Sequence, residues 1–215
     1  MLLPFNFQND TYLVLDFSAT NPDLATLDLT DTSVFTKYVF EKLKAAGVRV
    51  GVGGYNEHRV IYRRSAHFNT DEDPREIHLG IDFWAEAGTP VFAPLAGIVH
   101  SFRDNANFGD YGPTIILEHQ DNVAQKPHYS LYGHLTRTSL EGLYEGKSFK
   151  KGEKLGEIGP YPENGDWPPH LHFQRMTDML GLKGDFPGVC SLRDRAKFLT
   201  ICPNPNDWLG IEGLP

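Results

Sequence analysis

The sequence predicts a mainly β protein, an antiparallel β-sandwich or open barrel with an N-terminal α/β extension. Glycine (21) and proline (15) are frequent among the 215 residues, which suits many short strands joined by tight turns rather than a helical bundle. Between residues 77 and 176, short β-prone runs alternate with glycine or proline at even spacing. Clear helical periodicity occurs near the N-terminus.

Residues 1–70 are expected to form the extension, with one helix and a few strands. The helix is predicted over 32–46, where apolar residues recur at helical spacing, with Asp31 as the N-cap and Gly47 as the stop. The strands are predicted over apolar or β-prone runs at 12–17, 48–54 and 59–63.

Residues 71–180 are expected to form the β domain, and residues 181–215 a turn-rich extension packed on it, with a short helix at 192–199. The strands predicted in the β domain are 89–92, 97–102, 114–118, 128–135, 154–158 and 170–175.

Charge and composition exclude several partners. The formal net charge of −8 argues against nucleic acid or an anionic membrane as the main partner. The sequence has no apolar run of membrane-spanning length and no signal peptide, so the chain as it stands is expected in the cytoplasm, or exported if a leader has been removed. Cys190 and Cys202 are close enough in sequence for a local disulfide, but the sequence does not decide whether they pair. It does not decide the oligomeric state either.

The strongest chemical signal is the stretch around His170 and His172. In a strand these two side chains leave the same face with Cα atoms about 6.6 Å apart, while Leu171 and Phe173 pack on the other face. One imidazole could then hold a metal and the other could act on what the metal binds. The alternative is a pair of hydrogen-bonded histidines on a polar sheet face.

A second motif, His78-Leu-Gly-Ile-Asp82, offers an imidazole and a carboxylate. In a straight strand they would lie about 13 Å apart, but Gly80 permits a sharp bend between them. With a third ligand from the His-x-His pair, a fourth tetrahedral position stays free for water, the pattern of catalytic zinc. Iron and copper remain open from ligand type alone, and the alternative is an ordinary turn.

A third motif, Leu131-Tyr-Gly-His134-Leu, places a histidine at the end of a predicted strand. Such a residue can lie on the surface, form a structural hydrogen bond or act as an acid–base group.

In combination and in this order, the motifs resemble the lysostaphin-type (LytM-like) zinc endopeptidases. The resemblance runs from about Arg75 to Arg175 and includes Gly-Thr-Pro-Val-x-Ala-Pro-x-x-Gly-x-Val between the first and third motifs. It implies an antiparallel β fold of the LytM-like peptidase type, a Zn²⁺ cofactor and a peptide substrate. By resemblance, the metal ligands are His78, Asp82 and His172, and the catalytic residues are His134 and His170.

The resemblance implies a zinc-dependent endopeptidase that hydrolyses small-residue or cell-wall-type peptides. Zinc would make a hydroxide nucleophile available near neutral pH. One of His134 and His170 would take the proton of the water, and the other would bind the oxyanion or protonate the leaving amine; which does which stays open. The alternatives are a non-catalytic zinc-holding module that binds a peptide or protein, and a hydrolase of a non-peptide amide.

Other residues are expected near the site or on the surface. In some relatives an N-terminal segment crosses the groove and an asparagine completes the metal sphere, a role that Asn56 or Asn69 could take. Four aromatic residues could line the cleft, of which Trp84 and Tyr132 could equally belong to the core; the other two are Tyr111 and Trp167. His119 and His128 flank a predicted hairpin and are expected on the surface.

Overall fold

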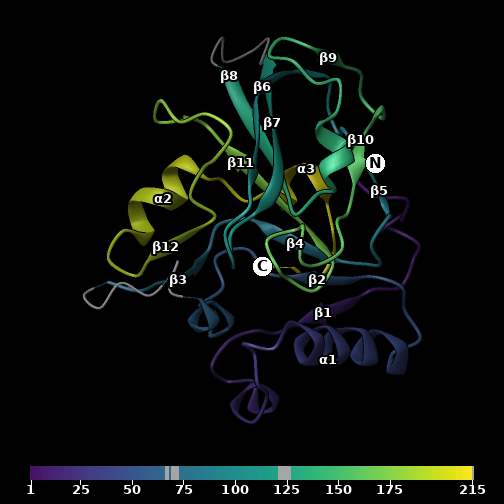
Figure 1. The fold of residues 1–215 in the computed structure, drawn as a ribbon, viewed down its shortest axis with the longest axis vertical. Helices are drawn as coiled ribbons and strands as arrows, with labels where there is room; N and C mark the ends of the chain where they lie inside the picture. The colour runs from purple at the N-terminus through teal and green to yellow at the C-terminus, as the bar shows by residue number, and fades with distance from the viewer. Residues whose placement is uncertain (66–67, 69–72, 121–126, 215) are drawn as a thin grey trace.

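The protein is built around one eight-stranded sheet (Figure 1). The structure, a computed structural model, describes residues 1–65, 68, 73–120 and 127–214. In spatial order the strands are β1 (Leu13–Leu15), β2 (Gly51–Gly53), β4 (Ile81–Trp84), β11 (His170–Met176), β8 (Pro127–Gly133), β7 (Gly112–Gln120), β6 (Gly97–Asn105) and β9 (Ser148–Phe149). β1 and β2 are parallel, and all other neighbours are antiparallel, which confirms the predicted mainly antiparallel β fold.

Two small sheets complete the β structure. One pairs β5 (Pro90–Phe92) with β10 (Lys154–Glu157), and the other pairs β3 (Arg75–His78) with β12 (Val189–Ser191). The six strands predicted between residues 89 and 175 are all present, as β5, β6, β7, β8, β10 and β11.

The predicted N-terminal helix is present as α1 (Thr32–Ala45), beside β1 at one end of the sheet (Figure 1). Asp31 is its N-cap, because the carboxylate accepts the backbone N–H groups of Ser33 and Val34 at 2.8 and 3.2 Å. The buried face of α1 carries Phe35, Val39 and Leu43, so the helix docks on the body of the protein.

The predicted strand at 59–63 is wrong. Residues from Ile61 form the 3₁₀ helix η2 (Ile61–Arg64), and His58 and Arg59 form isolated β-bridges with Ile77 and Ser18 rather than a strand. A strand would place residues three apart on opposite faces, whereas a 3₁₀ turn places them on the same side. The Arg59 guanidinium donates to the Tyr62 hydroxyl at 3.3 Å, a contact consistent with this turn.

The remaining helices are short. They are η1 (Pro22–Ala25), η3 (Arg137–Leu140), α2 (Arg195–Ile201) and α3 (Asn206–Leu209). The C-terminal helix expected at 192–199 begins at Arg195, after a turn. Cys190 and Cys202 are both free and buried, so the disulfide considered from the sequence is not formed. No helix in the described part of the chain is both long and apolar enough to cross a membrane.

The register between β4 and β11 separates the core from the chemistry. His172 lies opposite Asp82, and His170 lies opposite Trp84. Because side chains alternate along a strand, the intervening residues face the other way, into the main hydrophobic core. Those core residues are Ile81, Phe83, Leu171 and Phe173.

Candidate metal centre

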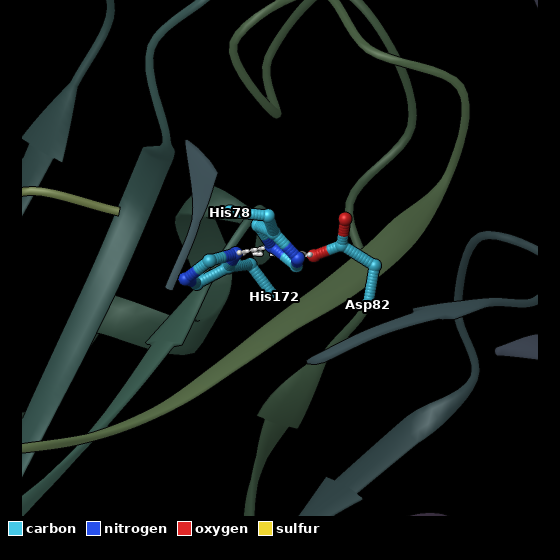
Figure 2. Close-up of side chains that lie close together, drawn as sticks. All are labelled: His78, Asp82 and His172. Carbon is cyan, nitrogen blue, oxygen red and sulfur yellow. Dashed lines mark hydrogen bonds and ion pairs between the residues drawn. The ribbon is translucent and has the colours of Figure 1, made fainter. Parts of the chain in front are cut away.

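Three potential ligand atoms converge between β3, β4 and β11 (Figure 2). His78 Nε2 lies 3.0 Å from His172 Nδ1, and Asp82 Oδ1 lies 3.0 Å from His172 Nδ1 and 3.2 Å from His78 Nε2. The three residues are buried. The side chains of the three residues predicted as ligands therefore lie together, and their three facing atoms form a triangle.

Gly80 makes this convergence possible. The chain bends between the end of β3 at His78 and the start of β4 at Ile81, which brings His78 and Asp82 together. A Cβ at Gly80 would lie 2.7 Å from His172 Nε2 and from the Phe173 carbonyl oxygen. The position therefore has no room for a side chain, in addition to requiring a bend.

The hydrogen bonds of the imidazoles fix their tautomers. His78 Nδ1 donates to the Gly54 carbonyl at 2.8 Å, so its proton is not on Nε2. His172 Nε2 donates to Gln174 Oε1 at 2.9 Å. The Gln174 amide is oriented in turn, because its own Nε2 donates to the Pro187 carbonyl. The proton of His172 is therefore not on Nδ1. Such outer partners hold ligating histidines in place.

The donor set fits a cation such as zinc. Two imidazole lone pairs and one carboxylate oxygen face each other, and the tautomers above place no proton between them. Such buried acceptor atoms repel one another, and a bound cation would stabilise them. Zinc bonds of about 2.0–2.1 Å at tetrahedral angles place ligand atoms about 3.3 Å apart, close to the spacing of this triangle. Two nitrogens and one carboxylate also leave an open position, as in catalytic sites.

Electrostatics keep His78 and Asp82 in the protonation states that suit metal binding. Burial, and then the charge of Arg59, lowers the pKa of His78 to about 4, so the imidazole is neutral at pH 7. Burial alone would raise the pKa of Asp82, but His78 and Arg59 outweigh it and hold the pKa well below its ordinary value. Asp82 is therefore a carboxylate.

His134 and His170 lie beside the triangle. Their ring centroids are 4.1 Å apart, and the His134 ring lies 6.3 Å from that of His172. His134 sits at the end of β8 with a positive φ of 63°, and its backbone N–H donates to the Tyr111 carbonyl at 2.8 Å. The turn after Gly133 thus directs this imidazole to the site rather than along the strand.

Both of these histidines present an unprotonated Nε2. His134 Nδ1 donates to the Asn164 carbonyl at 2.7 Å, and His170 Nδ1 donates to the Pro168 carbonyl at 2.7 Å. Burial lowers the pKa of His170 to about 4 and that of His134 well below its ordinary value. Both imidazoles are therefore neutral at pH 7, and each presents an Nε2 lone pair that can accept a hydrogen bond or a proton from a bound group.

Asp82, His134, His170 and His172 line one partly open pocket of about 130 Å³, and His78 is not among its lining residues. His134 and His170 are only 5% and 3% exposed. The aromatic residues of its wall include Tyr62, Trp84, Tyr111, Trp167 and Phe186. Of the four aromatic residues expected at the cleft, Tyr132 does not line this cavity but belongs to the main core.

Several expectations about neighbouring residues need correction. The side chain of Asn56 accepts a hydrogen bond from Arg195 Nε at 2.8 Å and is not part of the triangle. Asn69 lies outside the described residues. His119 is not on the surface: it is 1% exposed, with its ring nitrogens bonded to the Ala96 carbonyl and the Ser130 hydroxyl.

Sequence reasoning missed the groups that hold the ligands. Arg59 Nη1 contacts the second carboxylate oxygen of Asp82 at 2.5 Å, and Gln174 orients His172. Gln174 stands two residues after His172, where the strand period places it on the same face, and this spacing was an available signal. Arg59 carries no comparable local signal.

Comparisons with known proteins find a matching family model over the segment that carries these residues. Residues 76–182 match the model described as Peptidase family M23. Among curated proteins, the DD-carboxypeptidase/endopeptidase Mpg of Neisseria meningitidis serogroup B is 32% identical over 128 residues, which are 57% of this chain and 26% of that protein. Lysostaphin of Staphylococcus staphylolyticus is 31% identical over 133 residues, 60% of this chain and 25% of that protein.

Among solved structures, the catalytic domain of lysostaphin from Staphylococcus simulans is 27% identical and matches 57% of this chain and 80% of its own, with a TM-score of 0.38. The chain spans about a quarter of the length of the curated relatives it matches.

Proposed function

Because the chain belongs to peptidase family M23 through residues 76–182, we propose that it is a zinc-dependent endopeptidase that hydrolyses peptide bonds between small residues. One observation carries the proposal: three acceptor atoms suited to a metal and two neutral histidines with free Nε2 atoms meet in the same buried region. His78, Asp82 and His172 would hold the ion.

The residues of the chain divide the remaining work. When bound, zinc would polarise the peptide carbonyl and activate a water molecule near neutral pH. His134 and His170 supply the acid–base groups: the Nε2 of one accepts the proton of the attacking water, and the other, after taking up a proton from solvent, donates it to the developing oxyanion or to the leaving amine. Their Nδ1 hydrogen bonds to backbone carbonyls hold both rings in the required tautomer.

The size of the cavity supports small substrates. Its volume of about 130 Å³ is close to that of a ~150 Å³ cavity that accommodates benzene, so only a few heavy atoms fit beside the histidines. We expect the aromatic residues in the wall to disfavour bulky side chains next to the scissile bond. Glycine or alanine on both sides of that bond satisfies this limit.

A non-catalytic, zinc-holding module that binds a peptide or protein is the second candidate. The burial of His134 and His170 favours it, because a substrate must reach nearly covered groups. A binding module, however, has no use for two unprotonated Nε2 atoms beside the metal ligands.

The test measures metal content and hydrolysis of glycine-rich and alanine-containing peptides, and of a non-peptide amide. The enzyme is expected to carry about one zinc per chain and to cleave the small-residue peptides. Chelation should abolish turnover and added zinc should restore it. His170→Ala should retain zinc and lose turnover, and His100→Ala, in β6 outside the cavity, should retain both. Zinc binding with no turnover of any peptide would favour the binding module.

A further inference from the structure

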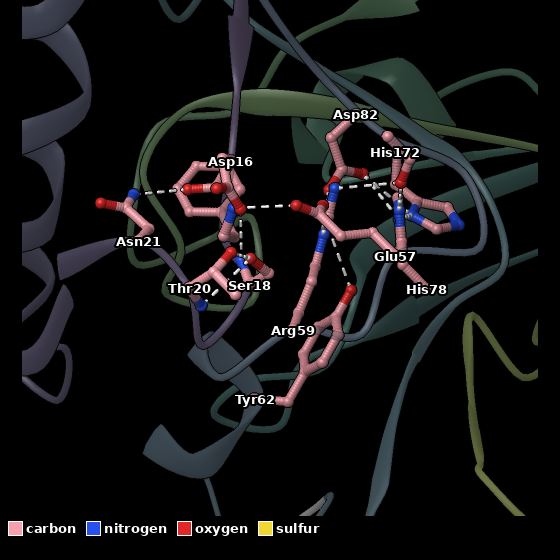
Figure 3. A network of polar contacts seen from close by, with 12 residues as sticks. Asp16, Ser18, Thr20, Asn21, Glu57, Arg59, Tyr62, His78, Asp82 and His172 are labelled. Carbon is pink, nitrogen blue, oxygen red and sulfur yellow. Dashed lines mark hydrogen bonds and ion pairs between the residues drawn. The ribbon is translucent and has the colours of Figure 1, made fainter. Parts of the chain in front are cut away.

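The metal ligand Asp82 has a partner that lies outside the family-matched region. Arg59 belongs to the N-terminal extension, is fully buried, and donates from Nη1 to Asp82 Oδ2 at 2.5 Å (Figure 3). The other oxygen, Oδ1, faces His78 and His172. Arg59 therefore binds one carboxylate oxygen of Asp82, and the other oxygen is left to face the proposed metal position.

Arg59 also reaches the second ligand. Its Nη2 donates to the Gly54 carbonyl at 3.4 Å, and the same carbonyl accepts the Nδ1 proton of His78 at 2.8 Å. One guanidinium thus contacts Asp82 directly and His78 through a shared acceptor. Removing it would loosen two of the three ligands at once.

Further contacts fix the position of the Arg59 guanidinium. Nε donates to Glu57 Oε2 at 2.6 Å, and the other Glu57 oxygen accepts the backbone N–H of Phe17 at 2.9 Å. The Phe17 ring lies 5.5 Å from the guanidinium carbon. A Cβ at Gly53 would lie 2.6 Å from Nη2, so glycine at this position makes room for the guanidinium. The planar fork of arginine, unlike a lysine ammonium, can serve these acceptors together.

We propose that Arg59 is a positioning residue of the metal centre, which presents Asp82 to the metal through one oxygen and braces His78 through Gly54. The N-terminal extension thereby sets the metal affinity of a site whose ligands all lie in the family-matched region. The inference rests on the metal site proposed above but not on peptidase activity.

The experiment measures the zinc dissociation constant by competition with a chelator, for wild type, Arg59→Met and Arg59→Lys. Arg59→Met is expected to bind zinc about 10- to 100-fold more weakly, the usual cost of losing an outer partner of a ligand. Arg59→Lys should stay weaker than wild type, because an ammonium cannot serve Asp82, Glu57 and Gly54 together. Arg64→Met is the matched control: this buried arginine of η2 donates instead to Thr32 Oγ1, and its loss should leave zinc affinity unchanged.

A spectroscopic readout separates positioning from folding. In the cobalt-loaded protein, loss of Arg59 frees Asp82 Oδ2, so the visible absorption should weaken as the coordination number rises above four. If Arg59→Met does not fold, Gly53→Ala displaces the guanidinium without removing its charge and should give the same two changes. Unchanged or tighter zinc binding in the folded variants would overturn the inference. A wild-type protein that binds no zinc would overturn it and the proposed metal site together, whereas zinc binding without turnover would count against the proposed function alone.

Discussion

The imidazole of His170 stacks on the indole of Trp84, with ring centroids 4.1 Å apart and planes inclined by 17°. The stack follows from the register of β4 and β11, which places the two residues opposite each other. On its other sides the indole packs near Phe17 and Phe35 of the N-terminal extension, at 5.1 and 5.8 Å. The orientation of a proposed catalytic histidine thus depends on an aromatic cluster that the extension completes.

Replacing Trp84 with leucine should impair the enzyme in two ways. The free energy of unfolding should fall by about 2–5 kcal/mol, because a fully buried ring is lost and a cavity remains. The kcat should fall more than the KM changes, because His170 loses the surface that orients it. Trp84→Phe keeps a ring and should retain most of the activity; equal kcat for the two variants would contradict this role of the stack.

Removing either proposed acid–base group should separate metal binding from turnover. His134→Ala and His170→Ala should each lower kcat by about 10²–10⁴-fold while the zinc content stays near that of the wild type. The kcat of the double variant should be only slightly lower than that of the less active single variant, because the two groups act in one proton-transfer sequence. Elemental analysis and initial rates on the same preparations measure both effects, and full additivity would indicate independent roles.

The metal-free protein should lose stability on acidification. In the unfolded chain His170 titrates near pH 6.5, whereas burial lowers its folded-state pKa to about 4. Between these values the unfolded state binds more protons, so the stability that is fully present above pH 6.5 declines as the pH falls toward 4, by up to ~3 kcal/mol for this group. His134, with its pKa shifted in the same direction, adds to the slope. Thermal unfolding of metal-free wild type and of His134→Gln/His170→Gln should give a shallower pH dependence for the variant.

The cavity wall depends on a close contact between Tyr111 and Gly188. A Cβ at Gly188 would lie 1.8 Å from the Tyr111 hydroxyl and 2.7 Å from its Cζ, and that hydroxyl lies 3.4 Å from His172 Nε2. Gly188→Ala should therefore lower the melting temperature and the activity. Adding Tyr111→Phe removes the nearest clashing atom and should restore part of both losses. A double variant no better than Gly188→Ala alone would mean that the clash is relieved elsewhere.

The two cysteines should behave as protected thiols. Burial raises the pKa of Cys190 to about 11 and that of Cys202 to about 12, so very little thiolate is present at pH 8. An aromatic disulfide reagent should detect two thiols in the denatured protein and react slowly with the native protein. Rapid native reaction, or fewer than two thiols after denaturation without reductant, would contradict this state.

Local pattern was enough to predict how the side chains of the two main motifs are placed, whereas their assignment as metal ligands or catalytic residues rests on the family resemblance. The alternation of His170 and His172 with Leu171 fixes their common face wherever the segment is a strand, and Gly80 marks the bend that brings His78 to Asp82. The strands of the β domain follow from the same period-two reasoning. Their roles in metal binding and catalysis stay predictions until the measurements above are made.

Long-range contacts were beyond that reasoning. Arg59 precedes Asp82 by many residues and lies in a segment predicted as a strand, so no spacing rule joins them. The buried His119 also contacts Trp208, near the C-terminus, whose ring centroid lies 5.5 Å away. Such pairings depend on tertiary packing rather than on the residues around each partner.

The hydrogen-bonded seam between β2 and β4 limits how this protein can be dissected. The segment 1–70 predicted as an extension supplies the two strands that flank β4 on the side away from β11. A recombinant fragment trimmed to residues 76–182 would leave the backbone of β4 bare, and exposed strand edges recruit other chains. Such a fragment should be prone to aggregation even with every metal-binding and acid–base side chain intact, so library design or transplantation of this site has to start upstream of β1.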